Sequence, residues 1–282
     1  MALGIWVMGL TLAFAAGYIW WSWKPDKGQP TPDVPLFEEK DHKEINSPSR
    51  PESLAGRSYS DFKGLPMVAI VIDDLGYQKQ LSVDFIEVDV PLTLSFLPQA
   101  PFAGEMVRLA LQRGKESLLH LPMEPKDFPQ TNPGPKALLT SMSDEEIREI
   151  LGKDLEAFPQ MAGVNNHMGS RFTEDRHKMA LVLRTIKERK LYFFDSRTTP
   201  QSVILPLASR MGVKSIQRDI FLDNIVEEEA IRGQLDLLIR LAQERGFAVA
   251  CGHPFPQTLQ AIKEKFPDLQ DKVRVVPLSK LL

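Results

Sequence analysis

Acidic, imidazole and amide side chains collect at the ends of apolar segments in this 282-residue chain. Asp73 and Asp74 follow the apolar run 67–72, and His120 lies near the end of the run 117–121. The other polar groups in such positions are Asn165, Asn166, His167, Asp195 and His253. A single Asp or Asn after a strand is usually a turn former. So many polar groups at one edge, however, are costly to bury without a metal or a substrate.

Carboxylate and imidazole groups without thiolates suit a zinc-type divalent ion that acts as a Lewis acid on water. Asp73 and Asp74 are adjacent, so their side chains point in different directions and can take different roles at one site. One carboxylate could bind the ion and the other deprotonate the water, while a histidine protonates the leaving group. The pattern predicts metal-assisted hydrolysis of an acyl or related bond. The chain has no G-x-S-x-G elbow, which disfavours a serine nucleophile. It also has no Walker or G-x-G-x-x-G loop of the kind that binds phosphates.

The segments that position these residues alternate with helical patterns. Apolar runs predict strands at 67–72, 92–97, 117–121, 162–165, 192–194, 213–216, 247–250 and 273–276. A capping box starts a predicted helix at Ser143, and Gly246 stops another over 227–245. His177 lies on the polar face of a third, over 174–190, and is expected at the surface. The alternation predicts an α/β fold, either a β/α barrel or a doubly wound sheet. Both place active residues at the carboxyl ends of strands.

The N-terminal part of the chain differs in composition from the rest. Residues 2–23 contain no charged residue, and all four tryptophans lie in the first 23 residues. A helix of this length spans roughly 33 Å, which fits a bilayer core of about 30 Å. Trp20, Trp21 and Trp23 would form an interfacial aromatic belt before Lys24. We therefore expect residues 1–23 to be a transmembrane anchor, with a cleaved signal peptide as the alternative.

Residues 24–64 are predicted to be a disordered linker between this segment and a domain at 65–282. The linker holds six of the 22 prolines and 15 charged residues, and it has too few apolar residues to form a core. The net charge of the chain is −3, which excludes an electrostatic nucleic-acid binder. Its one cysteine, Cys251, excludes a disulfide framework and a cysteine-based zinc module.

Several motifs resemble those of the polysaccharide deacetylases, the NodB-homology group. V-I-D-D-L-G (71–76) resembles the first motif, whose first Asp is the general base and whose second binds the metal. G-K-E-S-L-L-H-L-P-M-E-P (114–125) resembles the second, and F-F-D-S (193–196) and V-A-C-G-H-P (249–254) resemble later ones. With L-S-F-L-P (94–98) and G-V-N-N-H-M-G-S-R-F (163–172), the set closely resembles the divergent polysaccharide deacetylase family over about residues 66–282.

This resemblance implies a distorted (β/α) barrel of about seven strands, a glycan or peptidoglycan-like substrate, and a divalent metal, with zinc expected. It implies that Asp73 is the catalytic base and His253 the acid. The second histidine of the second motif is Glu124 here. Either Glu124 binds the ion, or His167 completes a ligand set with Asp74 and His120. We favour the latter, because two histidines and one carboxylate are a common zinc set.

Five residues are expected to contact the substrate or to support the site. If His167 is the third metal ligand, Glu124 would orient a ligand imidazole or face the substrate. The third motif of the family, R-x-P-x-G, is present only loosely, so Arg171 or Arg197 is expected to supply its cation. The predicted substrate-binding set is Glu124, Asn166, Arg171, Asp195 and Arg197.

The favoured hypothesis is a metal-dependent de-N-acetylase at the bacterial envelope. Its domain is expected in the periplasm, anchored to the inner membrane or released there by cleavage. The alternative is a glycan-binding or scaffold protein that keeps the barrel and metal site without turnover. A phosphoesterase is less favoured, because few strand-end Lys or Arg residues could meet a phosphate. The domain has no tryptophan for stacking on sugars, which favours a short or modified glycan or a non-standard ligand.

Overall fold

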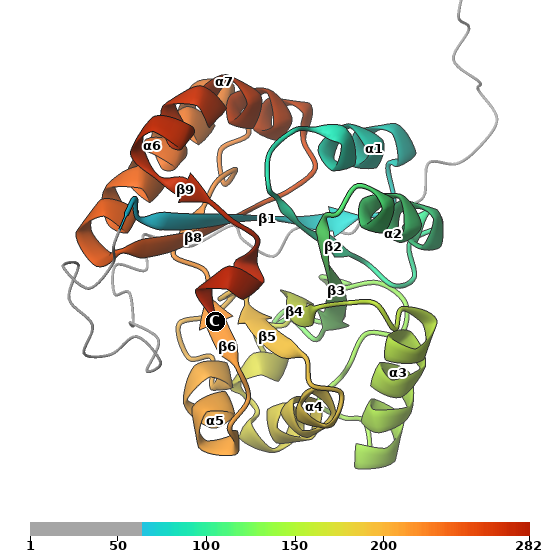
Figure 1. Ribbon diagram of the computed structural model, residues 1–282. Coiled ribbons are helices and arrows are strands. Elements are labelled where there is room, and N and C mark those ends of the chain that lie inside the picture. Colours follow the sequence, from blue (N-terminus) through green and yellow to red (C-terminus); the bar gives the residue numbers. More distant parts are fainter. Residues whose placement is uncertain (1–63) are drawn as a thin grey trace, which may run out of the picture. The chain divides into compact units, whose positions relative to one another are not determined.

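The computed structural model describes residues 64–282. The predicted membrane segment (1–23) and all but the last residue of the predicted linker (24–64) lie outside the described residues. Strands and helices alternate along the described part (Figure 1). The strands are β1 (Met67–Leu75), β2 (Thr93–Phe96), β3 (Glu116–Met123), β4 (Gly163–Met168), β5 (Tyr192–Asp195), β6 (Ser215–Gln217), β7 (Ile220–Phe221), β8 (Phe247–Gly252) and β9 (Arg274–Val275).

The helices lie on the outer side of the sheet (Figure 1). They are α1 (Lys79–Glu87), α2 (Ala103–Gln112), α3 (Asp144–Ala157), α4 (Arg176–Glu188), α5 (Ile204–Met211), α6 (Glu228–Arg245) and α7 (Pro256–Lys272), with 3₁₀ turns η3 (Phe172–Glu174) and η4 (Leu278–Leu281). Within residues 64–282, no helix combines the length and apolar character that a membrane span needs.

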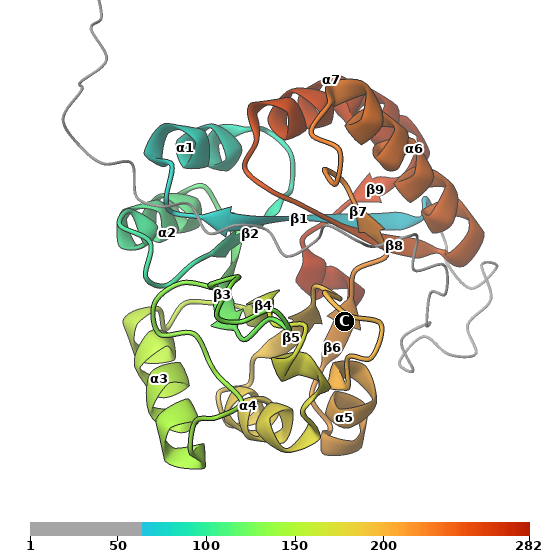
Figure 2. The same cartoon turned by 180° about the vertical axis from the view of Figure 1, so that it is seen from behind.

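The strands form one parallel sheet in the order β6-β5-β4-β3-β2-β1-β8-β7, and β9 pairs with the start of β1. Each strand up to β6 neighbours the one before it in the chain, without the reversal of a doubly wound sheet. The sheet curls, and β6 and β7 remain as edges (Figure 2). The predicted distorted barrel is therefore confirmed, with eight strands along the curl. The sequence prediction missed β7, because two residues show no periodicity.

Side chains of each strand alternate between the barrel interior and the helix-covered outside. On β1, Ala69 and Val71 belong to the interior cluster, while Val68, Ile70 and Ile72 pack outward in the larger core. Continuing the alternation places Asp73 inside the barrel. The same count on β3 places His120 inside, two residues beyond the interior residue Leu118.

The C-terminal turn η4 closes the amino end of the barrel (Figure 1). Leu278 and Leu281 join the interior cluster. The backbone N–H of Leu278 donates to Thr93 Oγ1 at the start of β2, and that of Ser279 donates to Glu116 at the start of β3. With the amino end filled by apolar side chains, the carboxyl ends of the strands are where a ligand can enter.

The helix signals in the sequence are confirmed at the positions they marked. Ser143 and Glu146 form a reciprocal capping box at the start of α3. Gly246 ends α6 with a φ of 89°, in the left-handed region that favours glycine. Helix α4 begins at Arg176 after the N-cap Asp175, and the largely exposed His177 near its start contacts Asp144.

Candidate active site

The end of β1 brings two adjacent carboxylates to the same side of the sheet. Asp73 follows the inward alternation, so Asp74 would by itself point outward. Asp74 instead has a φ of 56°, and the pairing register of β1 with β2 shifts between Ile72 and Leu75. A non-glycine residue with this φ is strained, and such strain is common at functional sites. This local turn brings the Asp74 carboxylate to the inward-facing histidines.

The side chains of Asp74, His120 and His167 converge at the carboxyl ends of β1, β3 and β4. Asp74 Oδ1 lies 3.0 Å from His120 Nε2 and 2.8 Å from His167 Nδ1. The two ring nitrogens are 3.3 Å apart. All three residues are buried, with at most 4% of the side-chain surface exposed. His120 and His167 lie on adjacent strands, whose register places His120 opposite Asn165 and His167 opposite Pro122.

This arrangement fits a divalent ion. Ligand atoms about 2.0–2.1 Å from a tetrahedral zinc would lie about 3.3 Å from one another. The observed separations of 2.8–3.3 Å are close to that value. Although Asp74 lies near two ring nitrogens, neither of its carboxylate oxygens makes a contact with hydrogen-bond geometry, and His167 Nε2 is also without a partner. Buried oxygens of this kind are costly unless an ion satisfies them.

The electrostatics of the cluster follow from burial and from the mutual proximity of its charges. Burial opposes ionisation of Asp74, but the two imidazoles outweigh it and hold the pKa of that carboxyl well below its usual range. Burial likewise opposes the charged form of His120. The carboxylates of Asp73 and Asp74 outweigh this effect and raise the pKa of His120. The cluster therefore holds an ionised carboxylate at neutral pH, as a metal ligand requires.

Asp73 lies next to this cluster and is held by three neutral donors. Asn165 Nδ2 donates to its Oδ1 at 2.8 Å. The Cys251 thiol donates to its Oδ2 at 2.9 Å, and Ser196 Oγ does so at 3.5 Å. Burial and the Asp73 carboxylate raise the pKa of the Cys251 thiol well above its ordinary value. Cys251 is therefore a neutral hydrogen-bond donor here and not a thiolate nucleophile.

His253 lies in the same pocket and is oriented by Asp223. Its Nδ1 is 2.9 Å from Asp223 Oδ1, and its backbone N–H donates to Asp223 Oδ2 at 2.6 Å. Thr258 Oγ1 also donates to Oδ2 of this carboxylate. Burial lowers the pKa of His253, but Asp223, helped by Asp73 and Asp74, raises it overall to about 9. The imidazole is thus protonated at neutral pH and suited to donate a proton.

Comparison with known proteins agrees with this geometry. Residues 70–282 match the family described as divergent polysaccharide deacetylase, which is most of the chain. The chain belongs to that family. The Escherichia coli K12 protein YibQ, described as uncharacterized, is 34% identical over 215 residues, which cover 76% of this chain and 67% of YibQ. A Haemophilus influenzae Rd protein, also described as uncharacterized, is 31% identical over 214 residues, which cover 76% of each chain.

A solved structure confirms the fold of this family domain. The crystal structure of the uncharacterized protein ATU2773 from Agrobacterium tumefaciens C58 has a TM-score of 0.74 and 29% sequence identity. The match covers 77% of this chain and 89% of that one. The family resemblance that the motifs indicated is therefore confirmed.

The pocket of this family member contains only part of the predicted set. Asp73, His120, His167 and His253 line it, and Asp74 contacts two of these. Of the five residues expected to bind substrate, Asn166 alone is among the lining residues. The Asn166 amide donates to the carbonyl of Met168 and accepts from the N–H of Ser196, so it also joins the ends of β4 and β5.

The Glu124 carboxylate contacts Thr140 and Arg171. Its Oε2 accepts from the backbone N–H of Thr140 at 2.5 Å and from Thr140 Oγ1 at 2.6 Å. Its Oε1 lies 3.5 Å from Arg171, whose guanidinium also donates to the carbonyl of Lys126. Glu124 and Arg171 thus hold both ends of the segment between β3 and α3. The structure shows no contact of Glu124 with a ligand imidazole, because this segment occupies its carboxylate.

Asp195 and Arg197 also have contacts outside the pocket. Asp195 follows the inward-facing Phe194, so its side chain points outward. Ser202 Oγ donates to Asp195 Oδ2, and the backbone N–H of Arg197 donates to Asp195 Oδ1. Burial raises the pKa of Asp195 despite these donors. The Arg197 guanidinium donates to Gln217 Oε1 at 3.1 Å. Both residues stabilise the turn after β5, and neither is among those that line the pocket.

Arg218 is the arginine among the residues that line the pocket, and it was not among the residues predicted from the sequence. Its guanidinium donates to the carbonyls of Ser196 and Arg197 and stacks on the Phe221 ring, 4.7 Å from the centroid. The chain crosses here from β6 to β7: Arg218 N–H donates to the carbonyl of Asp195, and the next N–H to the carbonyl of Val249. Ile216 faces the barrel interior, so alternation along the chain would place Arg218, two residues later, on the same face. This signal could have identified Arg218 from the sequence.

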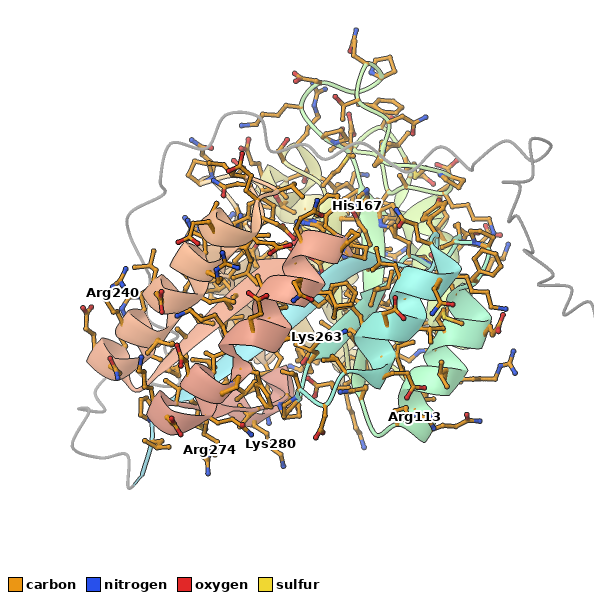
Figure 3. All side chains as sticks on the ribbon, turned by 90° about the horizontal axis from the view of Figure 1, so that it is seen from above. Arg113, His167, Arg240, Lys263, Arg274 and Lys280 are labelled. Carbon is orange, nitrogen blue, oxygen red and sulfur yellow. The ribbon has the colours of Figure 1, made fainter. Side chains whose placement is uncertain are left out.

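In Figure 3, His167 lies toward the side from which the segment between β3 and α3 projects. The labelled cations Arg113, Arg274 and Lys280 lie toward the other end of the described part. The cluster is therefore at the carboxyl end of the barrel, opposite the end that η4 fills.

Proposed function

We propose that this protein is a metal-dependent de-N-acetylase that acts on a carbohydrate of the bacterial envelope. One observation carries the proposal. Among the described residues, Asp74, His120 and His167 form the only cluster with the geometry of a three-ligand metal site. The carboxylate of Asp73 lies directly beside this cluster and is held by neutral donors. The protonated His253 lines the same pocket. Membership of the divergent polysaccharide deacetylase family supports a glycan amide as the bond that is hydrolysed.

Asp74, His120 and His167 would hold the ion, and zinc fits their donor set best. A divalent ion bound there supplies a Lewis acid that polarises the acyl oxygen and acidifies water. Asp73 accepts the proton of the attacking water, since its carboxylate adjoins the ligand cluster. Asn165 and Cys251 hold that carboxylate in a single orientation.

His253 donates a proton to the departing amine from the far side of the pocket. Asp223 keeps the imidazole charged and fixes its Nδ1 side, so Nε2 is the proton-donating atom. Asn166, Ser196, Thr198 and Arg218 provide polar edges for the sugar hydroxyls, and Phe221 provides an apolar face. We propose a short or modified glycan, because residues 65–282 contain no tryptophan that could stack on a longer sugar chain.

Acetate release from N-acetylated glycans tests this proposal. The purified full chain is loaded with Zn²⁺ and given chitooligosaccharides and N-acetylated peptidoglycan fragments, with and without chelator. We expect metal-dependent release that Asp73→Asn lowers by about 10²–10⁴-fold, the range for loss of a general base. Thr185→Ala, which alters a helix surface remote from the pocket, is the matched control. Absence of release across the whole panel with metal bound contradicts the proposal.

A glycan-binding protein without turnover is the competing function. It would show measurable glycan affinity that survives Asp73→Asn and no acetate release by the wild type. The replacement of the second motif histidine by Glu124 is the main reason to consider it. His167 offers a third ligand atom to the cluster, which weakens that reason.

We also propose that the domain works in the periplasm, tethered by residues 1–23 or released there by their cleavage. The uncharged run of 22 residues and its terminal tryptophans support this location. Fractionation of cells with a C-terminal epitope tag, followed by protease treatment of spheroplasts, tests it. Protection of the tag in intact spheroplasts contradicts a periplasmic domain.

A further inference from the structure

We propose that Asn165 is a positioning residue that couples the base Asp73 to the metal ligand His120. The inference deepens the proposed function and rests on it for the roles of these two residues. Asn165 lies in β4, its side chain points into the barrel, and none of its surface is exposed. It is on the strand next to that of His120, directly opposite it in register.

The Asn165 amide uses its full hydrogen-bonding capacity. Its Nδ2 donates to Asp73 Oδ1 at 2.8 Å and to Ser196 Oγ at 3.1 Å. Its Oδ1 accepts from Ser95 Oγ at 2.5 Å and contacts His120 Nδ1 at 3.0 Å. A primary amide offers two N–H donors and two acceptor sites, and each has a partner here. One side chain thus joins the ends of four other strands.

For His120, the contact decides which ring nitrogen faces the ion. Because both N–H groups of Asn165 are used by Asp73 and Ser196, the amide oxygen faces His120 Nδ1. Nδ1 must therefore carry a proton and donate it. Nε2, 3.0 Å from Asp74 Oδ1, then presents its lone pair to the ion site. A partner of this kind fixes the tautomer and the ring orientation of a ligand histidine.

For Asp73, the contact fixes the plane of the carboxylate. Asn165 holds Oδ1, while Cys251 and Ser196 approach Oδ2. All three donors are neutral, and His120 Nδ1 lies farther away, 3.9 Å from Oδ1. The same amide therefore sets the positions of the base and of one ligand relative to each other.

Asn166 provides a matched comparison inside the same strand. It has the same chemistry, is 1% exposed, and bonds to Met168, Thr198 and Ser196. None of those groups is a metal ligand or the base. If a buried amide in β4 mattered only for packing, loss of either asparagine would affect the ion site alike.

Zn²⁺ affinity of the full chain, measured by chelator competition, tests the assignment. Asn165→Leu keeps the branched shape and the number of side-chain heavy atoms but removes every hydrogen bond, and we expect about 10–100-fold weaker Zn²⁺ binding. Asn165→Asp keeps an oxygen toward His120 and should recover about tenfold of that loss or more. Asn166→Leu removes no hydrogen bond to a metal ligand or to the base, so its loss of Zn²⁺ affinity should be clearly smaller than that of Asn165→Leu. Circular dichroism checks folding, and Asn165→Ala replaces Asn165→Leu if the latter does not fold.

Acetate release provides the second readout. In Asn165→Asp the donor to Asp73 is replaced by a second acceptor, so kcat should fall at least about tenfold while KM changes little. Wild-type Zn²⁺ affinity in Asn165→Leu, or an equal loss in Asn166→Leu, overturns the inference. A wild type that binds Zn²⁺ but releases no acetate contradicts only the proposed function, since the affinity comparison still judges Asn165.

Discussion

The pair of His253 and Asp223 gives the sharpest prediction, because its effect has a known sign and a pH window. Asp223→Asn removes the carboxylate whose Oδ1 lies 2.9 Å from His253 Nδ1. In the wild type, the pKa of His253 is raised from 6.5 to about 9. At about 1.4 kcal/mol per pKa unit, this difference corresponds to about 3 kcal/mol in favour of the charged imidazole in the folded state.

The sign follows from the direction of the shift. Because the folded pKa lies above the unfolded one, the contribution to stability is complete below about pH 6.5. It decreases as the pH rises and is lost once the pH passes about 9. Asp73 and Asp74 also raise this pKa and remain in the variant, so we expect the pKa of His253 to fall by about 1–2 units in Asp223→Asn, not to its full unperturbed value.

Two measurements on the metal-free full chain check this prediction. An NMR titration of the His253 ring protons gives the pKa directly. Urea unfolding of wild type and variant between pH 6 and pH 10 gives the difference in free energy of unfolding, which should be about 1–3 kcal/mol larger at the acidic end. The hydrogen bonds from Thr258 and from the His253 N–H both end on Oδ2, and any weakening of them in the variant is independent of pH and appears as a constant offset.

Asp144→Asn is the control, because Asp144 also lies 2.9 Å from an imidazole, that of His177, but at the surface. Solvent screens that pair, so its pH-dependent difference should be much smaller. A pKa of His253 that does not change in Asp223→Asn would refute the reasoning. So would a stability difference between wild type and Asp223→Asn that is constant across the pH range.

Three further predictions concern single positions. Gly163→Ala should lower the free energy of urea unfolding by about 2 kcal/mol or more, because the added methyl would lie 2.7 Å from the carbonyl oxygen of Tyr192; an unchanged midpoint would contradict this. Ser143→Ala should cost about 1 kcal/mol through loss of the capping box, measured in the same way, and no loss would mean that the box is not formed in solution. Glu124→His should leave Zn²⁺ affinity unimproved, since this side chain faces Thr140, and tighter binding would place it at the ion site.

Two rules applied to the sequence predicted much of the site. Parallel strands place their carboxyl ends together, and this brought Asp73, His120, His167 and His253 to one pocket, as the structure shows. Alternation along a strand decides which neighbours face inward. It explains why Asp195, one residue after the inward-facing Phe194, points away from the pocket.

Other parts of the site depend on contacts between distant segments. Asp223 follows a strand of two residues, which leaves no periodic signal, and its role appears only because β7 pairs with β8 beside His253. Glu124 occupies a motif position that suggested a ligand. Its carboxylate is taken by Thr140, which is 16 residues away, and no local pattern could indicate that partner.

By itself, the amino-acid sequence determined the α/β class, the helix caps and the set of polar residues at the strand ends. These properties depend on local periodicity and on backbone capping, which neighbouring residues control. Only the tertiary structure decided which polar groups meet. The left-handed turn at Asp74, the crossing at Arg218 and the four contacts of Asn165 arise when strands far apart in the chain curl around one interior. Geometry of that kind is set by packing across the barrel, so it is not encoded in any single segment.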